Sequence, residues 1–300
     1  MVRTRFAPDR GLTSRMVLTM FLLGLLYVVF VAVLIALGVR TVAVVVIAGA
    51  LLFVQYFFSD KMALYAMNGR VVRPEEAPEL HGIVDRLSAL AGMPKPTVAI
   101  ADSDMPNAFA TGRNQKKAVV CVTTGILRRL EPTELEGVLA HELSHVAHRD
   151  VAVMTIASFL GVLAGLMTRM ALYTGLAGRE RRDNGIPIGL IVVAVSGLVY
   201  IVSFLLTRVL SRYRELSADR SGALLTGRPS ALASALTKVS GDMARIPTQD
   251  LRKAQPFNAF FFAPALKRDF SVSALFATHP PLERRLEQLA RISAQLGRGA

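Results

Sequence analysis

The chain has 300 residues, of which 52% are hydrophobic, and its formal net charge is +13. This apolar share is high for a soluble protein, where about 45–50% is usual even when glycine is counted. No basic run is interleaved with aromatic residues, which argues against a nucleic-acid-binding protein. The single cysteine, Cys121, excludes an internal disulfide framework. These values favour a membrane protein whose polar parts face a reducing compartment.

Two apolar segments without charged side chains open the chain, at residues 16–39 and 41–59. Each is close to the length of about 20 residues that a membrane-spanning helix needs. The arginine-rich N-terminus would suit a cleaved signal peptide, but the hydrophobic part of such a peptide spans only about 7–15 residues. We therefore predict that residues 1–59 form an N-terminal arm and a retained transmembrane hairpin.

A polar region follows at residues 60–150. An amphipathic helix is predicted at 75–92, where apolar residues recur on one stripe, and its His81 is expected to be solvated. Short strands are predicted at 97–101 and 118–123. Both kinds of element in one region indicate a small α+β domain.

Residues 141–145 read His-Glu-Leu-Ser-His, on a helix that is predicted to begin at Pro132 and extend to residue 147. The i, i+4 spacing places His141 and His145 on one face, where both can reach one metal ion. Glu142 lies beside the first histidine and can direct its carboxylate to a water molecule on that metal. The alternative, two surface histidines, is disfavoured because apolar neighbours on both sides of the motif would bury this helix.

Two further apolar segments follow, at 151–168 and 186–207. The first of them is short and meets Arg169, whose side chain can extend to the membrane interface. The alternative for this pair is a buried helical hairpin in a soluble fold. Together with the N-terminal hairpin, the pair predicts a mostly α-helical integral membrane protein with four transmembrane helices, in which 151–207 is the second hairpin.

The orientation in the membrane follows from the basic flanks. Basic residues in the N-terminal arm and after the second segment place residues 60–150 in the cytoplasm. Arginines between the third and fourth segments, at 179, 181 and 182, disagree with this rule. An even number of spans separates 60–150 from 208–300, so these two regions share one side in either orientation. We predict that they are the two halves of one catalytic domain.

The region 208–300 offers the third metal ligand. Helices are predicted at 208–226, as a continuation of the fourth span, and at 282–294, and the Phe-rich stretch 253–276 is interpreted as a loop or lid. Catalytic zinc has three protein ligands and one open position. Glu215 and Asp219 share a helix face, so one carboxylate can bind zinc and the other can accept the second N–H of a ligating histidine.

Two alternatives stay open at this point. Glu215 can equally form a surface ion pair with a neighbouring arginine, and its spacing does not decide between the two roles. His148 is closer in sequence to the motif, but three residues beyond His145 it would point away from the metal-facing side. We interpret His148 as a polar residue at the end of the helix.

Three motifs in this order make the sequence recognisable: HELSHVAHRD at 141–150, SRYRELSAD at 211–219 and THPPLERR at 278–285. Over essentially the whole chain, the sequence resembles the HtpX group of membrane zinc metalloproteases. That group belongs to the gluzincins and is related to prenyl-protein (CAAX) endoproteases. The resemblance implies a zincin-like catalytic domain with one zinc ion per chain, Glu215 as the third zinc ligand and Asp219 as its support.

The resemblance also bears on substrate binding. In similar enzymes a segment like residues 107–112 forms an edge strand beside the metal, where the substrate pairs backbone to backbone. An ordinary hairpin strand is the alternative. His279 is placed near the catalytic cleft, where it can donate to substrate or orient a neighbour, and the alternative is a structural hydrogen bond at a helix start. The predicted substrate-binding residues are Asn107, Ala108, Phe109 and Ala110.

These features predict a membrane-bound zinc endopeptidase of the plasma or inner membrane, with its active site facing the cytoplasm. Glu142 takes the proton of the attacking water and later passes it to the leaving amine. Extended polypeptide is the predicted substrate, and the resemblance implies quality control of misfolded membrane proteins. One alternative is a CAAX endoprotease, whose four spans would have to enclose a lipid-sized chamber. The other is a non-catalytic membrane scaffold, in which Glu142 would have no purpose.

Overall fold

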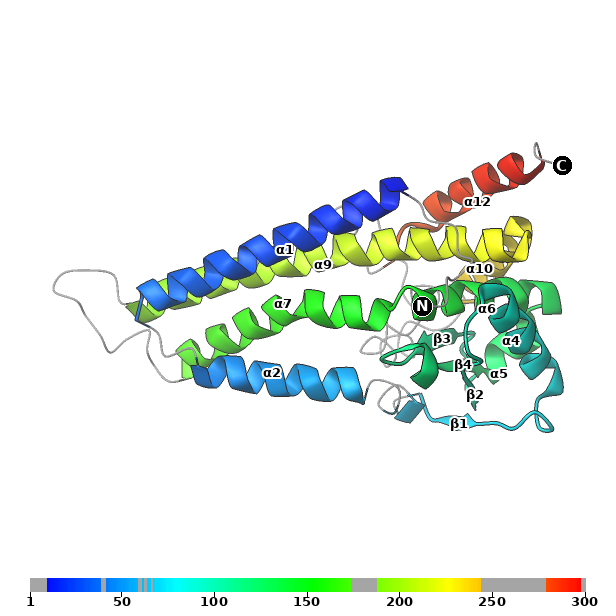
Figure 1. Ribbon diagram of the computed structural model, residues 1–300, viewed down its shortest axis with the longest axis horizontal. Coiled ribbons are helices and arrows are strands. Elements are labelled where there is room, and N and C mark those ends of the chain that lie inside the picture. Colours follow the sequence, from blue (N-terminus) through cyan, green and yellow to red (C-terminus); the bar gives the residue numbers. More distant parts are fainter. Residues whose placement is uncertain are drawn as a thin grey trace. The chain divides into compact units, whose positions relative to one another are not determined.

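The computed structural model of the chain describes residues 10–38, 42–58, 61, 64–65, 67–173, 188–243 and 279–297. These residues are mostly helical and carry one small mixed sheet (Figure 1). The predicted loop at 253–276 lies outside the described residues. The chain divides into two compact units. The apolar unit is Thr13–Tyr56 with Ala152–Leu210, and the sheet unit is Met1–Leu12, Phe57–Val151 and Ser211–Ala300.

The apolar unit is built from long hydrophobic helices. In the described part of the chain, three helices are long and apolar enough to cross a membrane: α1 (Arg10–Ala36), α7 (Asp150–Tyr173) and α9 (Ile188–Thr226). The helix α2 (Val42–Phe57) has 16 residues, fewer than the about 20 that a span needs. Residues 39–41, 59 and 60 next to it lie outside the described ones. Three of the four predicted spans are therefore found.

The helices of the apolar unit bury one face and expose the other. Phe30 and Leu34 of α1 pack in one cluster with Leu163 of α7 and Val199 of α9. In contrast, large apolar side chains such as Phe21 remain exposed. Such extensive exposed apolar surface is unfavourable in water and typical of contact with a partner or lipid.

Four short strands form the sheet, in the order β1-β2-β4-β3. The central strands β2 (Thr97–Ala101) and β4 (Val119–Thr123) run parallel and agree with the two predicted strands. At the two edges, β1 (Gly69–Val71) and β3 (Ala108–Thr111) pair antiparallel to their neighbours. The segment predicted to bind substrate is therefore an edge strand, and β1 is an element that the sequence did not indicate.

One face of the sheet packs against helices of the sheet unit. The core there combines Val120 of β4 with Leu87, Leu139 and Leu236, which come from three different helices. Around it lie α4 (Pro78–Ala91), α5 (Thr124–Arg129), α6 (Pro132–Ala147), α10 (Pro229–Met243) and α12 (Leu282–Gly297), with the short 3₁₀ helix η1 (Gln115–Lys117) between β3 and β4. On the opposite face, Cys121 is fully buried, and this burial raises the pKa of its thiol to about 12.

His81 corrects one expectation. It was expected to be solvated, but it is buried on α4 and its Nε2 lies 3.1 Å from the carbonyl oxygen of Val72. His81, Val84 and Ser88 widen the buried stripe of this helix beyond its purely apolar residues. A histidine tolerates such a position when a backbone oxygen satisfies its ring nitrogen.

Helix α9 ends where the sequence predicted. It runs through Thr226, and Gly227 then adopts a φ of +66°, in the left-handed region that favours glycine. Pro229 begins α10 directly afterwards. The segment 208–226 is thus a continuation of the last apolar helix, and it carries the Glu-containing motif within the sheet unit.

Candidate metal centre and active site

Helix α6 is specified strongly at its N-terminus. Glu131 and Glu134 form a capping box, in which each side chain accepts a backbone N–H of the other residue, and Pro132 occupies the first turn. The helix is buried along most of its length, and His141 and Glu142 are themselves buried. The two histidines of the motif are therefore fixed on an element that cannot easily shift.

A glycine brings α9 close to this helix. A Cβ atom at Gly222 would lie 2.8 Å from the backbone nitrogen of His141, closer than real Cβ atoms approach other atoms. The two helices meet backbone to backbone because Gly222 has no side chain. Glu215 lies two helical turns before this contact on α9, within reach of the histidines.

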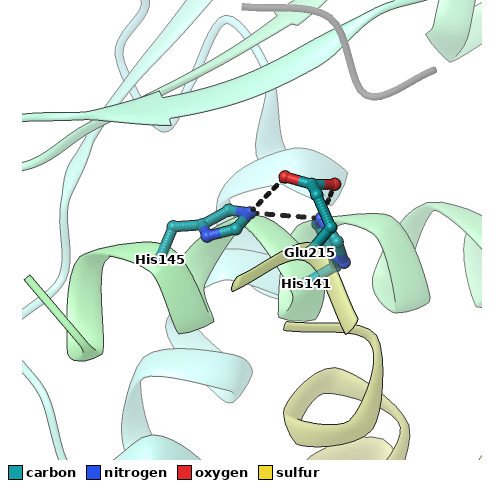
Figure 2. A group of neighbouring side chains, drawn as sticks. All are labelled: His141, His145 and Glu215. Carbon is teal, nitrogen blue, oxygen red and sulfur yellow. Dashed lines mark hydrogen bonds and ion pairs between the residues drawn. The ribbon is translucent and has the colours of Figure 1, made fainter. Parts of the chain in front are cut away.

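Three side chains converge from these two helices (Figure 2). The Nε2 atoms of His141 and His145 lie 3.2 Å apart. The Glu215 carboxylate lies 3.6 Å from Nε2 of His141 through one oxygen and 3.5 Å from Nε2 of His145 through the other. Tetrahedral zinc, with bonds of about 2.0–2.2 Å, holds its ligand atoms at roughly this spacing.

The other nitrogen of each imidazole faces a carboxylate. Nδ1 of His141 lies 2.9 Å from Oδ1 of Asp219, and Nδ1 of His145 lies 2.5 Å from Oδ2 of Asp150. A carboxylate that accepts the Nδ1–H favours the tautomer with the proton on Nδ1, so the lone pair of Nε2 is free to bind a metal ion. Two nitrogen lone pairs and the Glu215 carboxylate then point at one place, an arrangement that could hold a metal cation.

The buried charged side chains around the three converging ligand atoms indicate what charge a bound cation would need. Glu142, Asp150, Glu215 and Asp219 are buried carboxylates, and the buried guanidinium groups among them are those of Arg214 and Arg285. With the histidines neutral, four negative charges meet two positive ones. One divalent cation would neutralise the remainder, so these residues fit a zinc ion.

Without a metal, the same surplus of negative charge acts on His141. Burial opposes protonation of the ring, but the nearby carboxylates of Asp219 and Glu215 outweigh this effect and raise the pKa of His141 to about 9. Burial instead lowers the pKa of His145 to about 4. A proton on His141 thus supplies part of the positive charge that a bound metal ion would otherwise supply.

Glu142 stands apart from the three converging ligand atoms. Its Oε2 accepts a hydrogen bond of 3.0 Å from the backbone N–H of Ala110 in β3. Burial raises the pKa of its carboxyl, which brings this group closer to the range in which a general base works well. Glu142 is thus held beside the metal site and is available for proton transfer.

His279 lies against the third candidate ligand. Its Nδ1 is 3.0 Å from Oε2 of Glu215, and its side chain is buried. His148 lies elsewhere: it is the C-cap of α6, where its backbone N–H donates to Ser144, and it is not among the converging ligands. The residues immediately before His279 lie outside the described ones.

Edge strand β3 presents part of its backbone away from the sheet. The backbone N–H of Thr123 donates to the carbonyl of Asn107, which faces β4. Backbone groups alternate between the two edges of a strand, so Ala108 and Ala110 face the opposite side. This agrees with the N–H of Ala110, which donates to Glu142.

Three charged residues at the site were not singled out from the sequence: Asp150, Arg214 and Arg285. Arg285 on α12 donates from Nε and Nη2 to the two oxygens of Asp219, at 2.7 Å each. Each of the three belongs to a motif quoted above. Asp150 is the last residue of HELSHVAHRD, Arg214 precedes Glu215 in SRYRELSAD, and Arg285 is the last residue of THPPLERR. Their place in these motifs, close to the predicted ligands in the sequence, was the available signal.

Known proteins resemble this chain over nearly its whole length. The family model described as Peptidase family M48 matches residues 74–293. Protease HtpX homolog 1 of Streptomyces coelicolor is 65% identical over 99% of this chain and 97% of its own length. Protease HtpX homolog of Moorella thermoacetica is 53% identical over 98% of this chain and 99% of its own length.

A solved structure shares the fold. The crystal structure of S. mikatae Ste24p matches 94% of this chain and 67% of its own chain, with a TM-score of 0.55 and 16% sequence identity. At this identity the likeness concerns the fold alone. It extends over both the apolar unit and the sheet unit, because so little of the chain is left unmatched.

Proposed function

Because this chain belongs to peptidase family M48 and is a membrane metalloprotease, we propose that His141, His145 and Glu215 hold its catalytic zinc ion. One observation carries this assignment. Both Nδ1 atoms face carboxylates, so both Nε2 lone pairs converge with the Glu215 carboxylate on one place. Asp219 supports His141 in this arrangement, and the two halves 60–150 and 208–300 form one catalytic domain around it.

The chemistry at the site is peptide hydrolysis. When bound, zinc supplies Lewis acidity, which polarises the scissile carbonyl and lowers the pKa of water to about 7. Glu142 takes the proton from the attacking water and passes it to the leaving amine. The hydrogen bond from Ala110 holds this carboxylate in place between the two transfers.

His279 is proposed to act from the other side of the site. With Nδ1 directed at Glu215, its Nε2 is buried and has no hydrogen-bond partner among the described residues. A buried, unsatisfied ring nitrogen is unfavourable unless a ligand completes it. As an imidazolium, with one N–H directed at Glu215, His279 could donate the other N–H to a substrate carbonyl, which would stabilise the charge that develops on that oxygen.

We infer that the substrate is an extended polypeptide paired with β3. The open edge of this strand offers the backbone groups of Ala108 and the carbonyl of Ala110, whose N–H donates to the base Glu142. Such pairing recognises extended chain and reads side chains weakly, so segments that have lost their fold are the natural substrates. Asn107 and Phe109, whose backbone groups face β4, hold the strand in the sheet.

The setting of the enzyme is proposed to be the plasma or inner membrane, with α2 as a fourth span and the site on the cytoplasmic side. Misfolded membrane proteins would then be within reach. Relatives named Protease HtpX homolog match nearly the whole chain, which favours this function over CAAX endoproteolysis. A scaffold without catalysis is disfavoured because the chain belongs to a peptidase family.

The test is cleavage of casein and of an unfolded membrane protein by the purified full-length chain. A chelator should abolish cleavage, and zinc added in slight excess should restore it, since the proposed site requires the metal for chemistry. Cleavage that persists after complete zinc removal, checked by metal analysis, would contradict the proposal.

Asp219→Asn should weaken zinc affinity or activity by roughly 10–100-fold, the usual effect of losing a carboxylate behind a ligating histidine. The reason is that Asp219 accepts the Nδ1–H of His141. Metal competition titration and cleavage rates would measure it. Asp85→Asn is the matched control, because Asp85 is an exposed carboxylate that pairs with Lys95 away from the site. Equal values for the two variants would refute the role.

A further inference from the structure

His145 depends on a carboxylate from the next helix. Asp150, the first residue of α7, places Oδ2 2.5 Å from Nδ1 of His145 and is buried. The turn between α6 and α7 makes this contact possible. In that turn Arg149 has a φ of +57°, which is uncommon for a residue other than glycine. Such a conformation persists where surrounding contacts fix it.

Asp150 is itself held by a buried arginine of α9. Nη2 of Arg214 contacts Oδ2 of Asp150, and Nη1 donates to the backbone carbonyl of the same residue at 3.0 Å. Both side chains are almost completely buried. Arg214 therefore binds both the side chain and the backbone of Asp150, which fixes the position and direction of the carboxylate.

The contact repeats the arrangement behind the other histidine. Asp219 accepts from His141 and is held by Arg285, and Asp150 accepts from His145 and is held by Arg214. The two histidines thus have the same kind of support from different elements. The support of His141 comes from α9 and α12, and that of His145 from α7 and α9, where α7 and α9 are helices that continue through the apolar unit.

We propose that Asp150 and Arg214 are positioning residues of the metal site: Arg214 fixes Asp150, and Asp150 fixes the ring of His145 with its Nε2 directed at the metal. The inference rests on the proposed role of His145 as a zinc ligand. It makes zinc affinity dependent on the start of α7 and on α9, two helices that are long and apolar enough to cross a membrane. A purely structural ion pair would support folding without affecting the metal.

Zinc affinity separates these two roles. Purified full-length protein and its variants are titrated with zinc against a chromophoric chelator. Asp150→Asn keeps the shape of the side chain and removes its charge, and we expect the Kd for zinc to rise roughly 10–100-fold. Arg214→Gln should raise it in the same direction. The double variant should bind zinc within about twofold of Asp150→Asn alone, because Arg214 acts through Asp150.

Glu134→Gln is the matched structural control. Like Asp150, Glu134 is a buried carboxylate in an ion pair. It lies on α6 and pairs with Lys238 at 2.8 Å. Its loss should lower the thermal denaturation midpoint and leave the Kd for zinc unchanged. The visible spectrum of cobalt-substituted protein adds a second readout: it should change in Asp150→Asn, where a ligand is reoriented, and stay constant in Glu134→Gln.

Each outcome has a definite meaning. If His145→Ala binds zinc as tightly as the parent protein, the proposed ligand set fails and this inference fails with it. If His145→Ala loses zinc while Asp150→Asn binds it within about twofold of the parent, the inference alone is overturned. If the losses of zinc affinity in Asp150→Asn and Arg214→Gln multiply in the double variant, Arg214 does not act through Asp150. If Asp150→Asn does not fold, the double variant, which leaves neither charge unpaired, gives the comparison with the parent.

Discussion

Replacing Glu142 by glutamine is expected to lower the rate of polypeptide cleavage by roughly 10²–10⁴-fold, the contribution of a general base, while zinc stays bound. Glutamine keeps the shape of the side chain and its ability to accept the N–H of Ala110, but it cannot take a proton from water. Glu142 is not among the converging ligand atoms, so the metal site should keep its affinity.

The measurement combines a cleavage assay with metal analysis on one purified sample. If the parent enzyme degrades itself during purification, full-length protein should accumulate in Glu142→Gln. His141→Ala is the informative comparison, because it should lose metal and activity together. A variant that cleaves unfolded substrate at nearly the parental rate, in the absence of contaminating protease, would exclude this mechanism and make the metal site structural.

The elements that carry the site followed from local rules. Pro132 predicted the start of α6, and the structure has this helix over the predicted residues, Pro132–Ala147. The end of α9 followed from Gly227 and Pro229. Strands β2 and β4 agree with the short strands predicted at 97–101 and 118–123. Each of these signals lies within a few residues of the element that it specifies.

Contacts between distant elements did not follow in the same way. Arg214 and Asp150 are separated by 64 positions, and Arg285 and Asp219 by 66. Nothing in local spacing indicates which arginine meets which aspartate. Gly222 is a similar case, because its neighbours in the sequence do not indicate that it packs against the backbone of His141. For Glu215, spacing alone allowed a ligand or a surface ion pair. Its carboxylate lies 3.6 Å and 3.5 Å from the Nε2 atoms of the two histidines, which supports the ligand role proposed above.

Glu215→Gln is expected to raise the Kd for zinc by more than the roughly 10–100-fold of Asp219→Asn, because it removes a ligand rather than a residue behind one, and to lower cleavage with it. Buried charge gives the reason: the site would keep two guanidinium groups and lose one of its four carboxylates. Zinc at about 100 times its Kd stabilises a folded protein by about 2.7 kcal/mol. The zinc-dependent rise in the denaturation midpoint of the parent should therefore disappear in the variant at the same concentration.

Glu215→Asp serves as the companion variant, because it keeps the negative charge and only shortens the side chain. If the charge at this position is what the metal needs, Glu215→Asp should bind zinc more tightly than Glu215→Gln although it has the poorer reach. Far-UV circular dichroism of both variants checks that the helices persist. Stoichiometric zinc and parental activity in Glu215→Gln, alongside their loss in His141→Ala, would remove Glu215 from the ligand set. His279, whose Nδ1 lies 3.0 Å from Oε2 of Glu215, would then be the next ligand to test.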